Sequence, residues 1–312
     1  MKSVLYLFNG TGWGDHFLAI PFIKHHTEKY GQESLLIITY QKHIEGLFKN
    51  INALYIGLEK PDFCFSLLEN KIIKFDPDRI ICFNAFNGFD FDCHIQLLYP
   101  NRKYFGTYTK EGHSIRHPYK EYAHTRDQYF LLPGEELNYT NEHKLLNFDQ
   151  EEESRFKNHF QSILISYDID NTIIVHLDSE HRKLWNPKSW YLTFRMLLEK
   201  KKNILLIGSN REMINCYINY LPELNFVEEP DIRKVFWLVK TYNYFIGIDS
   251  VFAHIADAYN RTGIILFSDY PRHEWGPVSN KLSLLTPAPG KLTTDISFQS
   301  MCELLEHKFE LV

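Results

Sequence analysis

The chain has 312 residues, 44% of them hydrophobic, and a formal net charge of -5 at pH 7, so it can bury two ordinary cores and we expect two domains. The weak negative charge gives no field that would gather nucleic acid or an anionic membrane, and no nucleic-acid partner is expected. The five cysteines are scattered without a C-x-x-C pair, so neither a disulfide framework nor a zinc knuckle is expected. No apolar run approaches the roughly 18 residues that span a bilayer, so no membrane-spanning helix is expected. We therefore expect a cytoplasmic protein.

Seven short apolar runs predict strands along the chain. They are residues 3–8, 34–39, 79–83, 172–177, 203–208, 244–249 and 263–268. Most are continuous rather than alternating, which is typical of strands covered on both faces in a parallel sheet. Amphipathic segments predict helices at 15–30, 41–49, 188–202, 211–220 and 231–241. Because strands and helices alternate in both halves, the sequence predicts an α/β protein with two doubly wound parallel sheets.

A polar segment, residues 132–160, separates the two halves and ends in a charged stretch that predicts a helix. We therefore place the domain junction near 160–170, with an N-terminal domain over 1–165 and a second domain over 166–295. The remaining segment, 296–312, contains a last predicted helix at 296–309. That helix could fold back across the junction, and nothing in its local sequence decides this.

The first strand leads into a glycine-rich turn at residues 10–14. Its G-x-G-x-G spacing differs from the G-x-G-x-x-G of dinucleotide folds, and the second strand ends in Thr39 where that fold needs an acidic residue. A P-loop is excluded as well. What remains is a turn that lets backbone approach a ligand and carries Asp15 to the first turn of a helix. The ordinary alternative is that Asp15 only caps this helix.

Two further strand-to-helix turns carry polar groups. Residues 175–190 run from a strand through a loop with Ser179, Arg182 and Lys183, which are hydroxyl and cationic groups suited to phosphate. Residues 245–267 place Asp249 and Ser250 at a helix start, with His254 one turn later. Each group also has an ordinary explanation as helix cap, core residue or surface charge. Three such turns in two domains together indicate a ligand site.

These three segments resemble those of the bacterial lipopolysaccharide heptosyltransferases, glycosyltransferase family nine. The resemblance rests on Gly14-Asp15 with Pro21, on Ser179 with Lys183-Leu184-Trp185, and on Asp249-Ser250 with His254. Their order and distances fit this family across nearly the whole chain. The chain differs at Val251-Phe252, where the family usually has a small residue after the Asp-Ser/Thr pair.

The resemblance implies a GT-B fold, in which two Rossmann-like domains face a cleft. It places the acceptor on the N-terminal domain and the nucleotide-sugar mostly on the C-terminal domain. The implied activity is inverting transfer from a nucleotide-diphosphate sugar, with ADP-heptose as the expected donor, to a glycan or glycolipid acceptor. Such an acceptor is compatible with peripheral contact at the cytoplasmic face of the inner membrane.

The resemblance also suggests roles for individual residues. Asp15 would be the base that takes the proton of the acceptor hydroxyl, and Lys183 would neutralise charge on the leaving phosphate. The residues expected to bind the donor are Gly14, Ser179, Arg182, Asp249, Ser250 and His254. No cofactor and no metal are then required. Asp-x-Asp occurs at 76–78, 90–92 and 168–170, but none follows an apolar strand as a metal site of that type would need.

Residues 99–126 form a basic, aromatic segment with six Lys/Arg and only two acidic residues. It could hold an anionic acceptor by charge-assisted hydrogen bonds and ring stacking, although nucleic-acid binding or an ordinary surface loop would use the same composition. The acceptor-binding candidates are Thr11, Arg102, Lys103 and Arg116. Two alternatives to sugar transfer stay open from the sequence: a nucleotide-sugar epimerase of the same fold, and a non-catalytic nucleotide- or sugar-binding protein.

Overall fold

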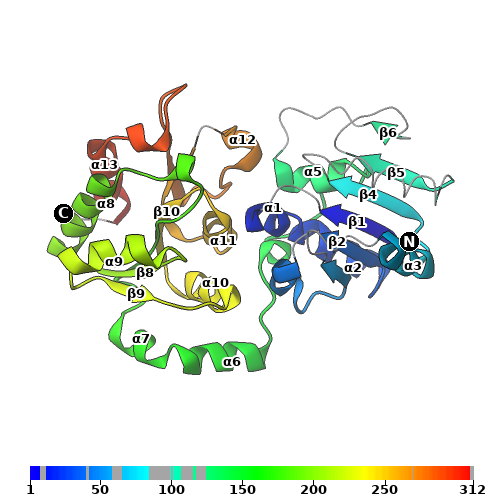
Figure 1. Cartoon of the computed structure of the whole chain (residues 1–312), viewed down its shortest axis with the longest axis horizontal. Coiled ribbons are helices and arrows are strands. Elements are labelled where there is room, and N and C mark those ends of the chain that lie inside the picture. Colours follow the sequence, from blue (N-terminus) through cyan, green and yellow to red (C-terminus); the bar gives the residue numbers. More distant parts are fainter. Residues whose placement is uncertain are drawn as a thin grey trace. The chain divides into compact units, whose positions relative to one another are not determined.

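The protein is described from a computed structural model, which forms two compact units, Met1–Asn147 and Phe148–Val312 (Figure 1). The structure describes residues 1–7, 12–39, 42–57, 65–83, 99, 101–106, 115–116, 124–268 and 270–309. Each unit is an α/β body built on its own sheet. The division lies earlier than the boundary expected at 165/166, because the charged helix after residue 149 packs with the second unit.

The first unit contains a six-stranded sheet in the order β3-β2-β1-β4-β5-β6, with every pair parallel. Its strands are β1 Ser3–Leu7, β2 Leu35–Thr39, β3 Leu54–Gly57, β4 Arg79–Phe83, β5 Lys103–Gly106 and β6 Ile115–Arg116. Its helices are α1 Trp13–Leu18, α2 Ile20–Tyr30, α3 Phe65–Phe75 and α5 Thr125–Leu131, with 3-10 turns η1 Lys42–Phe48 and η2 Glu142–Lys144. This is the strand order of a doubly wound nucleotide-binding fold.

The second unit repeats this order as β12-β11-β10-β7-β8-β9, again with every pair parallel. Its strands are β7 Thr172–His176, β8 Asn203–Ile207, β9 Asn225–Val227, β10 Tyr244–Ile248, β11 Thr262–Leu266 and β12 Leu282–Leu285. Its helices and 3-10 turns are α6 Gln150–His159, α7 Gln161–Ser166, η3 His181–Lys183, α8 Pro187–Glu199, α9 Arg211–Tyr220, α10 Ile232–Thr241, α11 Val251–Ala258, α12 Arg272–Trp275, η4 Thr293–Asp295 and α13 Phe298–Phe309. The prediction of two doubly wound parallel sheets is confirmed.

The continuous apolar runs reflect burial on both faces of each sheet. In β7, Ile173 and Val175 belong to the core cluster that includes side chains of α8, α9 and α13, while Ile174 between them is also fully buried. The other face of this sheet is covered by α10 and α11 (Figure 1). All seven predicted strands are present, because this burial pattern leaves a clear trace in the sequence.

The helix predicted over 15–30 is two helices, α1 and α2, which are separated at Ala19. Pro21 explains the break, since proline lacks the N–H that a continuous helix would use and its ring crowds the carbonyl four residues earlier. In the first turn of α2 that N–H needs no partner, so proline is well tolerated there. The segment predicted as a helix over 41–49 is the 3-10 turn η1.

A buried ion pair joins the charged helix α6 to α10. Arg233 donates from Nε to Glu152 Oε1 at 2.6 Å and from Nη2 to Oε2 at 2.8 Å, and both side chains are almost fully buried. The Arg233 guanidinium also lies 4.6 Å from the centre of the Phe148 ring. The C-terminal helix α13 likewise packs within this unit, where Met301 and Leu305 are fully buried in its core.

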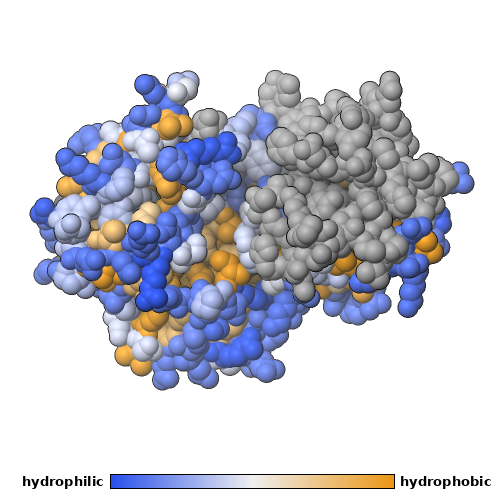
Figure 2. Space-filling model, viewed as in Figure 1, coloured by the Kyte–Doolittle hydropathy of each residue, from blue (hydrophilic) through white to orange (hydrophobic). Residues whose placement is uncertain are grey.

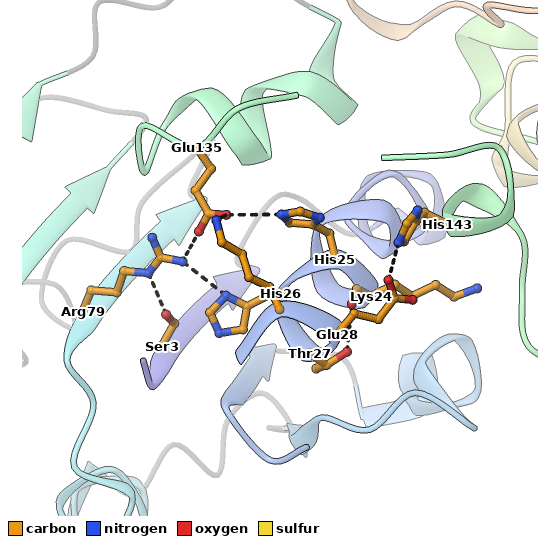
Figure 3. A network of polar contacts seen from close by, with 10 residues as sticks. Ser3, Lys24, His25, His26, Thr27, Glu28, Arg79, Glu135 and His143 are labelled. Atoms are coloured by element: carbon orange, nitrogen blue, oxygen red, sulfur yellow. Dashed lines mark hydrogen bonds and ion pairs between the residues drawn. The ribbon is translucent and has the colours of Figure 1, made fainter. Parts of the chain in front are cut away.

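In the first unit, a buried polar network joins α2 to the segment after α5 (Figure 3). Arg79 donates to Ser3 Oγ at 2.7 Å and forms an ion pair with Glu135, and its Nη2 lies 3.2 Å from His26 Nδ1. Burial opposes ionisation of Glu135, but Arg79 outweighs it and lowers the pKa of the carboxyl. Lys24 Nζ donates to the Leu145 carbonyl at 2.7 Å, which ties the same segment to α2 further along.

The exterior of the second unit is mainly hydrophilic in the view of Figure 2, with hydrophobic residues interspersed. Its most exposed large hydrophobic side chains, Ile165, Tyr220 and Val278, come from different parts of the chain. None of the helices in the described ranges is long and apolar enough to cross a membrane.

Removing one partner of the α6–α10 ion pair should destabilise the second unit. In Glu152→Ala, Arg233 keeps a buried charge without its partner, so we expect a loss of about 3–5 kcal/mol in the free energy of unfolding. The double variant Glu152→Ala/Arg233→Ala should lose less than the sum of the two single variants. Urea unfolding followed by tryptophan fluorescence measures both. Glu151→Ala, an exposed neighbour on α6, is the control, and an equal effect there would contradict this role.

His26 should make the first unit sensitive to acid. Burial, together with Arg79, lowers the pKa of His26 to about 4, so the folded unit resists protonation that the unfolded chain accepts near its ordinary value of 6.5. This stabilisation is complete above pH 6.5 and is lost as the pH falls toward 4, and it amounts to about 3 kcal/mol. The protection factors of the β1 and β4 amides, which correct hydrogen exchange for the pH dependence of the intrinsic rate, should fall on acidification in the wild type and much less in His26→Gln. The exposed His307→Gln is the control, and equal acid sensitivity in His26→Gln would refute the assignment.

Candidate functional site

The candidate site of the second unit lies at the carboxyl ends of β7 and β10. These strands are neighbours in the sheet, but β7 continues to β8 on one side and β10 to β11 on the other. The chain therefore leaves the two strand ends in opposite directions, and the following loops lie beside each other at this point. Open α/β sheets bind their ligands at such a switch of strand order. The polar turns at 177–186 and 249–250 both start here.

Lys183 and Asp249 are the charged pair of this site. Lys183 Nζ lies 2.9 Å from Asp249 Oδ2, and the same oxygen accepts a hydrogen bond of 3.0 Å from Ser268 Oγ. The side chains of Lys183 and Asp249 are 15% and 8% exposed, so the pair is screened from much of the solvent. Ser179 Oγ donates to the backbone carbonyl of Asp249 at 3.2 Å, which joins the β7 loop to the β10 loop. The structure therefore brings three of the predicted residues together.

Arg182 is placed differently from its neighbour Lys183. Its side chain is half exposed, pairs with Glu180 at 3.0 Å, and lies with its guanidinium carbon 4.8 Å from the centre of the Tyr270 ring. Its Nη2 also donates to the Tyr270 hydroxyl. An exposed pair of this kind contributes little to stability. Arg182 is thus available at the rim of the site, whereas Lys183 lies inside it.

Ser250 begins α11, but its hydroxyl does not cap that helix. Its Oγ lies 3.2 Å from Nδ1 of His176, the last residue of β7, and Nε2 of His176 lies 2.8 Å from Asp178 Oδ1. The other oxygen, Asp178 Oδ2, accepts from the backbone N–H of Ser209 and of Asn210 at 2.6 and 2.8 Å. Burial opposes ionisation of Asp178, but these hydrogen bonds and His176 outweigh it and hold the pKa of Asp178 far below its ordinary value.

The remaining residues of this turn are buried in α11. His254 is only 5% exposed, and Val251 and Phe252 are 9% and 5% exposed. The Phe252 ring lies 4.3 Å from the His176 ring and 5.4 Å from the Phe236 ring, measured between centres. The bulk at Val251-Phe252 is therefore taken up mainly by the core of the unit.

In the first unit, Asp15 is the third residue of α1 rather than its cap. Gly12 occupies the capping position, and Gly14, expected in the loop, lies in the first turn of the helix. A Cβ on Gly12 would lie 3.4 Å from Asp15 Oδ2, so the carboxylate sits beside that backbone. His16 holds the turn, since its Nδ1 lies 2.9 Å from the Gly12 carbonyl and its Nε2 lies 2.8 Å from Thr39 Oγ1. The interpretation of Asp15 as a simple cap was wrong.

Of the acceptor candidates, Arg102, Lys103 and Arg116 belong to the described part of the first unit. Thr11 lies outside the described residues, as do residues 100, 107–114 and 117–123 of the basic segment 99–126. Arg102 pairs with Asp76 at 3.0 Å, Lys103 is exposed at the start of β5, and Arg116 ends β6.

The Asp-x-Asp sequences that are described hold the protein itself together. Asp78 accepts from the backbone N–H of Lys2 at 2.7 Å, and Asp170 accepts from Asn243 at 2.6 Å. Residues 90–92 lie outside the described ranges. Within the part of the chain that the structure describes, no group of three or more His, Cys, Asp or Glu side chains is arranged to hold a metal ion.

Comparison with known proteins assigns the chain to a family. The family model for glycosyltransferase family 9 (heptosyltransferase) matches residues 107–295, which is more than half of the chain. The chain belongs to glycosyltransferase family 9. It is therefore a glycosyltransferase, and the resemblance carried by its three turns is confirmed. No curated protein matches the sequence.

Solved structures confirm the GT-B class for this family 9 member. The Escherichia coli ADP-heptose lipopolysaccharide heptosyltransferase II superposes with a TM-score of 0.77 at 17% identity, covering 99% of both chains. The E. coli heptosyltransferase WaaC with ADP gives a TM-score of 0.68 at 12% identity, covering 98% of this chain and 99% of that one. A UDP-GlcNAc 2-epimerase from Neisseria meningitidis gives 0.56 at 13% identity, covering 99% and 94%. At such identities the likeness concerns the fold.

Several residues of the site were not found from the sequence of this glycosyltransferase. His176 and Asp178 flank the end of a buried strand, where a histidine looks like an ordinary core residue. Ser268 and Tyr270 follow β11 and reach the site only through the strand order. Asp178 could have been recognised as a candidate site residue from the sequence, since it is the first acidic residue after an apolar strand.

Gly208 should be intolerant of a side chain because of Asp178. Its φ is +155°, a conformation that essentially only glycine adopts, and a Cβ there would clash with Asp178 Oδ1 and come within 3.0 Å of its Cγ. Gly208→Ala should therefore destabilise the second unit by about 3 kcal/mol, combining backbone strain with the displaced carboxylate. Gly290→Ala is the control, since Gly290 also has a positive φ but nothing within 4 Å of a Cβ. Thermal unfolding compares the two, and equal melting temperatures would rule out the clash with Asp178.

Proposed function

We propose that this glycosyltransferase transfers a sugar, with inversion at the anomeric carbon, from a nucleotide-diphosphate sugar to a glycan or glycolipid acceptor. ADP-heptose is the proposed donor, because similar structures include WaaC with ADP and WaaC with ADP-2-deoxy-2-fluoro heptose. The observation that carries the proposal is the screened Lys183–Asp249 pair beside the start of α11, at the switch of strand order in the second unit.

The donor's diphosphate is proposed to bind between Lys183 and the start of α11. The first N–H groups of a helix lack partners within it and favour anions, and α11 begins directly after Asp249-Ser250. A largely buried ammonium group attracts a phosphate more strongly than an exposed one, because less water screens it. Asp249, held by Ser268 as well as Lys183, is proposed to meet hydroxyl groups of the donor sugar.

The proposed reaction is a direct displacement. The acceptor oxygen forms a bond to the anomeric carbon while the bond from that carbon to the diphosphate oxygen breaks. The electron pair of the broken bond leaves with the diphosphate, where Lys183 offsets the added charge. The proton of the acceptor hydroxyl goes to Asp15, which acts as general base. The step needs no metal, and none is proposed.

The acceptor is proposed to bind to the first unit through basic side chains such as Lys103 and those of the segment 99–126. Guanidinium and ammonium groups there would pair with acidic sugars or phosphates on a glycan or glycolipid. We place the enzyme in the cytoplasm, with peripheral contact to the inner membrane when the acceptor is lipid-linked.

A thermal-shift screen against ADP-, UDP-, GDP- and dTDP-linked sugars tests the donor class, because a bound ligand raises the melting temperature according to its affinity. We expect ADP-heptose to give the largest shift. Absence of a shift with every donor would overturn the proposal. Conversion of a free donor without any acceptor would indicate epimerisation, the activity named for the structurally similar N. meningitidis enzyme.

Substitutions at Asp15 and Lys183 should separate catalysis from binding. Asp15→Asn should retain donor binding but lower the transfer rate about 10²–10⁴-fold, because the general base is lost. Lys183→Ala should weaken donor binding and also slow transfer, since the diphosphate loses its cation in both states. Glu136→Gln and Lys188→Ala are controls on exposed residues of the same two units. Transfer that survives in Asp15→Asn would exclude it as the base.

A further inference from the structure

A chain of close polar contacts runs from a buried carboxylate to the start of α11. It consists of Asp178, His176 and Ser250, with His176 in the middle and 5% exposed. None of the roles assigned above to the donor, acceptor or base uses His176 or Asp178. The chain ends on the Ser250 hydroxyl, where the donor's diphosphate is proposed to bind. The protonation of His176 therefore decides whether that hydroxyl can donate a hydrogen bond to an anion.

The positions of the protons along this chain follow from the charge of Asp178 and from the protonation of His176. Asp178 is ionised, because its pKa is held far below the ordinary value, and its negative charge favours a proton on His176 Nε2, which lies 2.8 Å from Oδ1. In neutral His176 the other nitrogen, Nδ1, then carries a lone pair and accepts the Ser250 proton. In protonated His176, Nδ1 donates to Ser250 Oγ instead. The Ser250 hydroxyl keeps its proton and is then free to donate it in another direction.

The surroundings keep His176 in place for this task. Phe252 lies against the ring, and Asp178 is anchored by the N–H groups of Ser209 and Asn210, so neither the imidazole nor the carboxylate is easily displaced. Of the other charged groups of the β7 and β10 loops, Lys183 is paired with Asp249 and Arg182 with Glu180. Phe236 of α10 contributes an apolar ring behind Phe252. Asp178 is thus the charged partner in direct contact with His176.

We propose that His176 and Asp178 are positioning residues that set the direction of the Ser250 hydroxyl for the donor's diphosphate. With neutral His176 the hydroxyl is turned toward the imidazole. With protonated His176 the hydroxyl donates to a phosphate oxygen, and the imidazolium adds a positive charge close by. Binding of the diphosphate is therefore linked to protonation of His176 and is tighter at lower pH. This inference rests on the proposed function, because it assumes that a nucleotide diphosphate binds at α11.

Isothermal titration calorimetry with ADP at about pH 6 and about pH 8.5 tests the link. The ionisation of ADP itself is common to all variants. In His176→Gln we expect the Kd to exceed the wild-type Kd by about tenfold at the lower pH and to approach it at the higher pH. The exposed His181→Gln, on the same loop, is the control and should follow the wild type at both.

Ser250→Ala gives a second measurement that does not disturb the buried imidazole. It should weaken ADP binding at the lower pH, where the wild-type hydroxyl donates to phosphate, and have little effect at the higher pH. An equal loss at both pH values, or an unchanged pH dependence in His176→Gln, would overturn the inference while leaving the proposed donor class intact. A wild-type protein that binds neither ADP nor any other nucleoside diphosphate would overturn both.

Discussion

The parallel pairing of β7 with β10 is the constraint on which the candidate site depends. It places His176 opposite Gly247 and so brings the two following loops together, although they are about seventy residues apart in the chain. Gly247 permits this packing, because a Cβ there would lie 2.8 Å from the Phe245 ring and 3.4 Å from the His176 carbonyl. Once the strands are paired in this register, the hydroxyl, ammonium and carboxylate groups have to meet at one sheet edge.

The charges gathered at that edge are stable because each has a partner. An isolated charge in a screened position is costly, whereas Lys183 and Asp249 neutralise each other and Asp178 Oδ2 accepts from two backbone N–H groups. The Lys183–Asp249 pair is therefore balanced in charge. An anion that approaches Lys183 has to compete with Asp249 or share the ammonium with it, and Ser268 can keep Asp249 satisfied while this happens.

The sequence predicted the main buried strands well, but it did not predict the side-chain contacts between residues that are distant in the chain. Strands buried on both faces leave continuous apolar runs, so β7 and β10 were found, whereas the three-residue β9 leaves too short a trace. Asp15 was placed correctly near the start of a helix, but its position as third residue depends on Gly12 and His16 holding the turn. The His176–Ser250 contact joins residues 74 apart, and only the strand order makes them neighbours.

The unusual bulk at Phe252 and the histidine at the end of β7 form one structural feature. A small residue at 252 would leave the apolar side of the His176 ring without its aromatic neighbour, and packing in protein interiors does not tolerate such voids well. Phe252 is buried, and its ring lies against the rings of both His176 and Phe236. The departure from the family pattern expected at Val251-Phe252 therefore lies where the start of α11 packs against the core of the unit.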